Sequence, residues 1–194
     1  MTFKEAPPSP VHRRSIEVET FEHGATSLLV VGRLRDNRFN ETRSFGGTVF
    51  PPGIVHDMII RLIVRRSDMT IESIDVEMPR TPRDECLEAQ NSLDLFRGTR
   101  IERGFTDRVR ASAGKGRGCT HLASLFLAMG SAAVQGAWSA MAERPLRLKD
   151  TGEAACALLE DTCLVWRSGG PAMKQLLERI DQDKALDDER PVRK

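Results

Sequence analysis

Residues 54–65 read IVHDMIIRLIVR, a nearly continuous apolar run that carries the polar side chains of His56, Asp57 and Arg61. A run of this length that is rich in β-branched residues predicts a strand. Because side chains alternate along a strand, His56 shares one face with Met58, whereas Asp57 and Arg61 share the other. We therefore expect a sheet whose core face carries His56, and an ion pair between Asp57 and Arg61 on the opposite face.

Three other stretches predict strands that belong to the same sheet. Residues 15–21, 27–35 and 68–78 alternate apolar and polar side chains, and a turn at Gly24 separates the first two. Residues 36–53 are rich in asparagine, arginine, glycine and proline, which predicts a long loop. The first half of the chain therefore predicts an antiparallel sheet of about four strands.

Beyond Pro82 the apolar residues recur at helical spacing. Helices are predicted over residues 83–96, 104–113, 118–144, 152–166 and 171–180. Strands followed by helices are typical of an α+β protein, in which the helical layer from the second half packs on one face of the sheet.

The length of 194 residues is that of one compact domain, which we place at residues 12–180. Residues 1–11 are rich in proline and predict a flexible arm. Residues 181–194 are highly charged and predict a disordered tail.

Composition narrows the range of partners. A formal net charge of +1, the lack of tyrosine and the presence of only two tryptophans disfavour a nucleic-acid partner. The sequence shows neither a secretory signal nor an uninterrupted apolar segment, which predicts no membrane contact. Four scattered cysteines further indicate the reducing cytoplasm. An exposed sheet face is compatible with a homodimer.

The run GKGRGCTH at residues 114–121 precedes and opens the predicted helix over 118–144. Its three glycines let the backbone approach a ligand closely, and the N–H groups at a helix start favour an anion. Lys115 and Arg117 add positive charge, and Thr120 or a neighbour can cap the helix. The run lacks the GxxxxGK[ST] spacing of nucleotide-binding loops. It predicts an anion or oxyanion site, with a solvated surface loop as the alternative.

Cys119 and His121 fall in the first turn of that helix. A helix N-terminus activates a thiol as a nucleophile and keeps an imidazole neutral, so that it can act as a base. The alternatives are a buried apolar cysteine and a capping histidine. His56 lies on the face where the helices dock, and an imidazole among aliphatic side chains is costly without a partner. We therefore interpret His56, His121 and Asp57 as candidate catalytic residues.

His12, Arg13 and Arg14 stand just before the first alternating stretch. They are either an exposed basic arm or cations that fold over the mouth of the sheet. The three histidines at 12, 56 and 121 are of a type that binds metals, but no HxxxH, HExxH or CxxC spacing occurs, so neither a metal nor a cofactor is predicted. The candidate substrate-binding residues are His12, Arg13, Arg14, Lys115, Arg117, Cys119 and Thr120.

Four motifs resemble a bacterial family catalogued as domain of unknown function 2889. They are HRRSIEV at 12–18, HDMIIRL at 56–62, GFTDRVR at 104–110 and GRGCTHL at 116–122. The resemblance extends from His12 to about Arg167. It implies a link to aromatic-compound degradation, which includes cofactor-independent lyases that release formaldehyde from lignin-derived dimers.

These considerations lead to one functional hypothesis and two alternatives. The hypothesis is a cofactor-independent carbon–carbon lyase, which needs a neutral histidine as base and a cationic or N–H cradle for the developing oxyanion. Its substrate is a small aromatic compound, bound against the apolar sheet face with methionines such as Met58 and Met129 as walls. The alternatives are a non-enzymatic binder of a small acidic or aromatic ligand and a His-ligated metalloenzyme.

Overall fold

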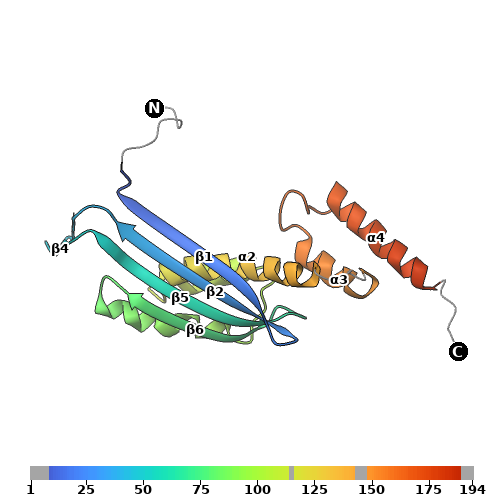
Figure 1. Cartoon of the computed structure of the whole chain (residues 1–194), viewed down its shortest axis with the longest axis horizontal. Helices are drawn as coiled ribbons and strands as arrows, with labels where there is room; N and C mark the ends of the chain where they lie inside the picture. Colours follow the sequence, from blue (N-terminus) through green and yellow to red (C-terminus); the bar gives the residue numbers. More distant parts are fainter. Residues whose placement is uncertain (1–8, 114–115, 143–147, 189–194) are drawn as a thin grey trace. The chain divides into compact units, whose positions relative to one another are not determined.

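Four long strands form one antiparallel sheet in the computed structural model, which describes residues 9–113, 116–142 and 148–188. In their order across the sheet the strands are β1 (His12–His23), β2 (Ser27–Arg38), β5 (Gly53–Arg65) and β6 (Ile71–Arg80) (Figure 1). Each strand is antiparallel to its neighbour. The predicted antiparallel sheet is therefore confirmed.

Shorter elements and helices complete the described chain. The remaining elements are β3 (Thr42–Arg43), β4 (Val49–Phe50), the 3₁₀ helix η1 (Asp84–Phe96), α1 (Phe105–Ala113), α2 (Thr120–Ala142), α3 (Leu148–Leu159) and α4 (Pro171–Asp188). The chain divides into two compact units, residues 1–137 and 138–194. The single domain over residues 12–180 and the flexible arm stay predictions, whereas residues 181–188 of the predicted disordered tail are helical.

The core of the first unit lies between one sheet face and the helices that cover it. Alternate residues of β2 and β5, such as Val30 and Ile60, are fully buried there, together with Leu125 and Phe126 of α2. The α+β class is therefore confirmed, with α2 packed against the sheet (Figure 1). By length and composition alone Thr120–Met141 could also cross a membrane. The buried, sheet-facing side of α2 accounts for that composition equally well.

Close approach between α2 and the sheet depends on a glycine. A Cβ atom added at Gly32 of β2 would lie 2.6 Å from the sulfur of Met129, which is fully buried. Met58 is also buried. Met58 and Met129 are therefore core residues rather than the predicted walls of a substrate pocket.

The predicted loop over residues 36–53 is shorter than expected, because both strands that flank it are longer. β2 continues to Arg38, β5 begins at Gly53, and the β3–β4 ladder lies between them. The alternation of buried residues along β2, which includes Leu34, continues as far as Asp36. Asp36 is thus a strand residue on the core face and not part of a loop.

The second unit differs from the predicted helix bounds. α3 ends at Leu159, because Asp161 adopts a left-handed conformation (φ 58°) and its N–H donates to the carbonyl of Trp166. Cys163 consequently lies beyond the helix that was predicted to hold it. α4 extends to Asp188, eight residues past the predicted end, through good helix formers such as Lys184 and Leu186.

Candidate functional site

A buried carboxylate, Asp36, lies at the centre of the candidate site. In the register of the sheet it stands between Arg14 of β1 and His56 of β5. These three residues therefore form one row across three strands, on the face that α2 covers. Asp36 is only 3% exposed, so its charge requires partners within the protein.

Arg14 supplies the strongest interaction of this carboxylate. Its Nε and Nη2 atoms donate hydrogen bonds of 2.7 Å each to the two oxygens of Asp36, the bidentate geometry that suits a guanidinium and a carboxylate. Burial alone would raise the pKa of Asp36. The hydrogen bonds and charge of Arg14 outweigh burial and bring the pKa to about 2. Asp36 is therefore ionised throughout the neutral range.

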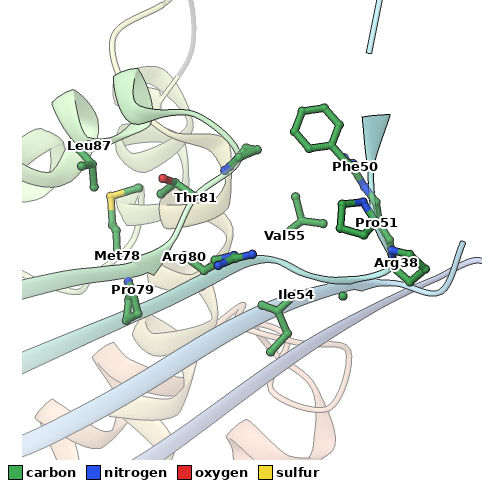
Figure 2. A pocket seen from close by; sticks show the side chains of 13 residues that line it. Arg38, Phe50, Pro51, Ile54, Val55, Met78, Pro79, Arg80, Thr81 and Leu87 are labelled. Atoms are coloured by element: carbon green, nitrogen blue, oxygen red, sulfur yellow. The ribbon is translucent and has the colours of Figure 1, made fainter. Parts of the chain in front are cut away.

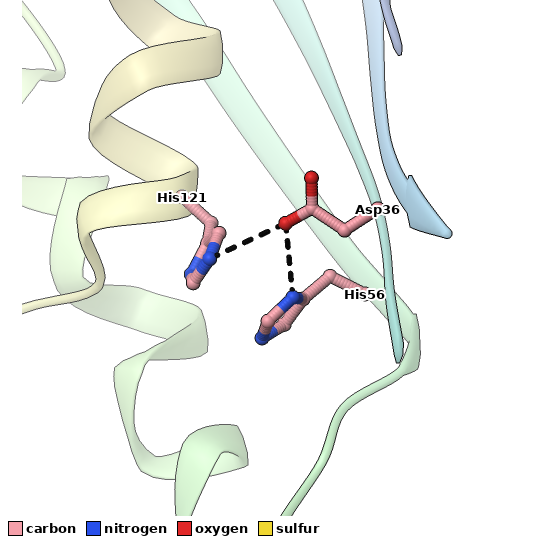
Figure 3. Close-up of side chains that lie close together, drawn as sticks. All are labelled: Asp36, His56 and His121. Carbon is pink, nitrogen blue, oxygen red and sulfur yellow. Dashed lines mark hydrogen bonds and ion pairs between the residues drawn. The ribbon is translucent and has the colours of Figure 1, made fainter. Parts of the chain in front are cut away.

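Two histidines converge on one oxygen of Asp36 (Figure 3). His56 Nδ1 lies 3.0 Å from Asp36 Oδ2, and His121 Nε2 lies 3.4 Å from the same atom. The two imidazole rings are stacked, with centroids 3.8 Å apart and an interplanar angle of 29°. His56 of the sheet thus faces His121 of the helix.

Both imidazoles favour their neutral form. Burial is the largest cause that lowers the pKa of each, and the positive charge of Arg14 adds to it. Asp36 acts in the opposite direction on both histidines, and a charge on His56 further lowers the pKa of His121. Because the rings are stacked, one proton on the pair disfavours a second. A neutral imidazole that is oriented by a carboxylate is the arrangement of a general base.

The start of α2 brings Cys119 to the site. Its carbonyl accepts the first helical hydrogen bond, from the N–H of Ala123 at 3.0 Å, so Cys119 is the N-cap residue. Its sulfur lies 3.7 Å from His121 Nδ1. Thr120 and Arg117 are exposed, and Lys115 lies outside the described residues. Of the predicted glycine-rich site, the structure therefore brings His121 to Asp36 and Cys119 to His121.

The N-terminal residues of β1 divide between the two sheet faces. His12 Nε2 lies 3.3 Å from Asp36 Oδ1, so His12 joins Arg14 on the side of the site. Arg13 stands between them in the sequence, and its guanidinium carbon lies 5.3 Å from the centre of the Phe39 ring. By strand alternation it belongs to the opposite face.

Asp57 does not join the two histidines. It lies on the other face of the sheet, where it accepts hydrogen bonds of 2.7 and 2.5 Å from Arg33. Arg61, the predicted partner of Asp57, pairs instead with Asp75 and Glu77 of β6. The predicted Asp57–Arg61 pair is therefore wrong, because cross-strand neighbours are closer than residues four apart along one strand. Asp36, and not Asp57, is the carboxylate beside the two histidines.

Asp36 was not among the predicted site residues, because residues 36–53 were predicted to form a loop. A usable signal was present: Leu28, Val30, Gly32 and Leu34 alternate along one face, and Asp36 is the next residue on that face. A carboxylate that continues a buried apolar stripe requires a cationic partner. Arg14, in the neighbouring predicted strand, meets that requirement.

The same atoms offer ligands to a metal ion. One donor atom each from Asp36, His56 and His121 lie within 4.8 Å of one another. Two imidazoles and a carboxylate are a set that zinc and non-haem iron accept. Arg14, however, places a positive charge on the same carboxylate.

Comparison with known proteins identifies a family of unknown function for this chain. A family model described as "Protein of unknown function (DUF2889)" matches residues 12–135. No curated protein and no solved structure matches the chain. The matched segment includes Asp36 and the four described residues that hydrogen-bond or ion-pair with it, His12, Arg14, His56 and His121.

Proposed function

The chain belongs to the DUF2889 family of proteins of unknown function, and we propose that it is a cofactor-independent carbon–carbon lyase. The proposed reaction releases formaldehyde from a small aromatic substrate of the kind found among lignin fragments. The observation that carries the proposal is the pair of stacked histidines that share the oxygen of one buried, ionised carboxylate.

His56 is the proposed base. With its Nδ1 proton donated to Asp36, the ring leaves Nε2 unprotonated and able to accept a proton from substrate. Asp36 fixes the tautomer and stabilises the imidazolium that forms, as a carboxylate does behind a catalytic histidine. Arg14 acts through Asp36 as a positioning residue, since its two hydrogen bonds hold the carboxylate in place.

The proposed step conserves atoms and charge. His56 takes the proton of a primary hydroxyl group, and the oxygen forms the C=O bond of formaldehyde as the carbon–carbon bond breaks. The electrons of that bond form a carbon–carbon double bond and expel an aryloxide from the adjacent carbon. The aryloxide then takes a proton, so the products are formaldehyde, an alkene and a phenol.

The departing aryloxide requires positive charge, and two features supply it. Arg14 remains 39% exposed at its side chain despite its contact with Asp36. The N–H groups at the start of α2 add the positive end of a 23-residue helix. His121, in the first turn of that helix, stacks on the ring of His56.

Single replacement of His56 and of His121 by glutamine tests the proposal. We expect His56→Gln to reduce formaldehyde release at least about a hundredfold, within the range that general base catalysis contributes, while the substrate still binds. Replacement of the remote, exposed His23 by glutamine is the matched control and should leave turnover unchanged. A protein that binds aromatic ligands without any turnover would instead be the non-enzymatic binder. Full activity in both site variants would refute the assignment of the base.

A His-ligated metalloenzyme is the second candidate, and the donor spacing favours it. Ligands about 2.1 Å from a metal lie roughly 3.0–3.4 Å apart, and Asp36 Oδ2 is 3.0 Å and 3.4 Å from its two histidine nitrogens. Elemental analysis of protein purified without added metal separates the two candidates. The metalloenzyme would be favoured if the wild-type protein contained zinc or iron in stoichiometric amount and if His121→Gln lost both the metal and the activity.

A further inference from the structure

A pocket of about 430 Å³ opens at the end of the sheet where Asp36 and His56 lie. Its volume is in the range of roughly 300–1,000 Å³ that is usual for small-molecule sites. Its apolar lining comes from β4, β5, β6 and η1, with Phe50, Val55, Met78 and Leu87 among the contributors (Figure 2). Two arginines, Arg38 and Arg80, also line it.

A β-bulge in β5 lies between the pocket and His56. Asp36 pairs with His56, but the next residue, Asn37, pairs with Ile54, so that Val55 is the extra residue of β5. An extra residue interrupts the strict alternation of side chains and re-aims them. Val55 and Ile54 therefore point to opposite sides of β5, and both line the pocket (Figure 2).

Arg38 connects the pocket with the site. It is two residues beyond Asp36 on the same strand, and it stands opposite His12 in the register of β1 and β2. Burial is the main cause that lowers the pKa of His56, and the charge of Arg38 contributes to the same shift. A ligand held by Arg38 thus lies within electrostatic reach of the proposed base.

The arginines retain capacity for a ligand. Among the described residues, Arg38 makes one side-chain hydrogen bond, from Nη1 to Thr42 Oγ1 at 2.9 Å, and Arg80 makes none. A planar guanidinium binds a carboxylate through two parallel hydrogen bonds and stacks on aromatic rings. Two such groups beside apolar side chains and prolines suit a molecule with an aromatic ring and a carboxylate.

We propose that this pocket binds an aromatic carboxylate, with its anionic group between Arg38 and Arg80 and its ring against Val55, Met78 and Leu87. The inference rests on the proposed lyase function and names its substrate class: an aromatic acid whose primary alcohol extends toward His56. The carboxylate is remote from the bond that breaks and serves to position the substrate.

Isothermal titration calorimetry on the full chain tests this assignment without turnover. The probes are trans-cinnamate, its neutral analogue cinnamamide, acetate and inorganic phosphate. We expect cinnamate to bind at least about tenfold more tightly than cinnamamide, the effect of a charge-assisted hydrogen bond, and acetate to bind too weakly to detect. Equal affinity for cinnamate and cinnamamide, or tighter binding of phosphate than of cinnamate, would overturn the proposal.

Arg80→Met keeps an apolar stem and removes the charge of an exposed side chain. We expect about tenfold weaker binding of cinnamate and unchanged binding of cinnamamide. Arg83→Met is the matched control, because Arg83 is exposed and outside the pocket lining. Leu87→Trp should fill the pocket and abolish binding of both ring compounds. The same cinnamate affinity in the Arg80 and Arg83 variants would contradict the assignment.

The two proposals fail in different ways. If cinnamate binds as expected but no aromatic acid with a primary alcohol releases formaldehyde, the lyase function fails and the pocket assignment stands. If formaldehyde is released, but Arg80→Met binds cinnamate as tightly as the wild type and cinnamamide binds as tightly as cinnamate, the lyase function stands and the pocket assignment fails. His56→Gln should bind cinnamate like the wild type in either case.

Discussion

Replacement of Asp36 by asparagine perturbs the centre of the site with a minimal change in shape. The carboxylate accepts two charge-assisted hydrogen bonds from Arg14 and one from His56. Loss of one partner of a fully buried ion pair costs about 3–5 kcal/mol. Asparagine keeps one acceptor oxygen, and the 39% exposed side chain of Arg14 can be solvated by water. We therefore expect a loss of about 2–3 kcal/mol in the free energy of unfolding.

Amide hydrogen exchange in β2 and β5 is the suitable measure of that loss. Both tryptophans, Trp138 and Trp166, lie outside the strands, so their fluorescence is only an indirect measure of the sheet. Exchange of the strand amides gives the opening free energy of the sheet itself. Asp57→Asn is the matched control, since Asp57 is a buried carboxylate with an equivalent bidentate arginine on the opposite face.

Imidazole titration followed by NMR separates the two variants. Asp36 raises the pKa of both His56 and His121 against the stronger effect of burial, so its neutralisation should lower both pKa values further. Asp57→Asn should weaken the sheet by a similar amount and leave both titrations unchanged. If Asp36→Asn left the two histidine pKa values unchanged or raised them, the carboxylate would not be the group that holds the histidine pair.

The remaining predictions concern charge, pH and packing. Arg14→Met should raise the pKa values of Asp36, His56 and His121, because it removes a cation that lowers all three; NMR titration of the carboxyl carbon and of the imidazoles checks this. For wild-type protein, kcat/KM for formaldehyde release should be constant above about pH 6.5 and fall on acidification, because the protonated base is inactive. The free energy of unfolding should also fall below about pH 6.5, because the histidines bind protons more readily in the unfolded chain than in the folded protein, where their pKa values are lowered. It should fall again from about pH 4 toward pH 2 as Asp36 is protonated. Urea titration across that pH range measures both losses. Gly32→Ala should destabilise the sheet by about 1–3 kcal/mol, because its Cβ would overlap the buried Met129; strand amide exchange gives the value, and no loss would contradict the close approach of α2.

Local sequence patterns predicted the sheet, because each strand carries its own alternation. The run at residues 54–65 placed His56 on the core face, and the apolar spacing after Gly118 placed His121 on a helix that packs there. The proximity of His56 and His121 follows from those two local patterns. That both histidines lie between the sheet and the helix could thus be predicted without the register of the strands.

The same local patterns could not predict which side chains pair between neighbouring strands. The partner of Asp57 is Arg33, which lies on a different strand, and its selection depends on register rather than on spacing along β5. Asp36 was missed for a related reason: the composition of residues 36–53 outweighed the alternation that continues from Leu34. The end of α3 was also missed, since the left-handed backbone at Asp161 has no apolar signature.

The mass balance of the reaction tests the central claim most directly. Chelator-treated wild-type protein should convert an aromatic acid that bears a primary alcohol and an aryloxy group two carbons from the carbinol carbon, and it should release formaldehyde and phenol in equal amounts. The same measurement on His56→Gln should give at least about a hundredfold slower release of both products. Release of phenol without formaldehyde, or activity that returns only when a metal is added, would contradict the account.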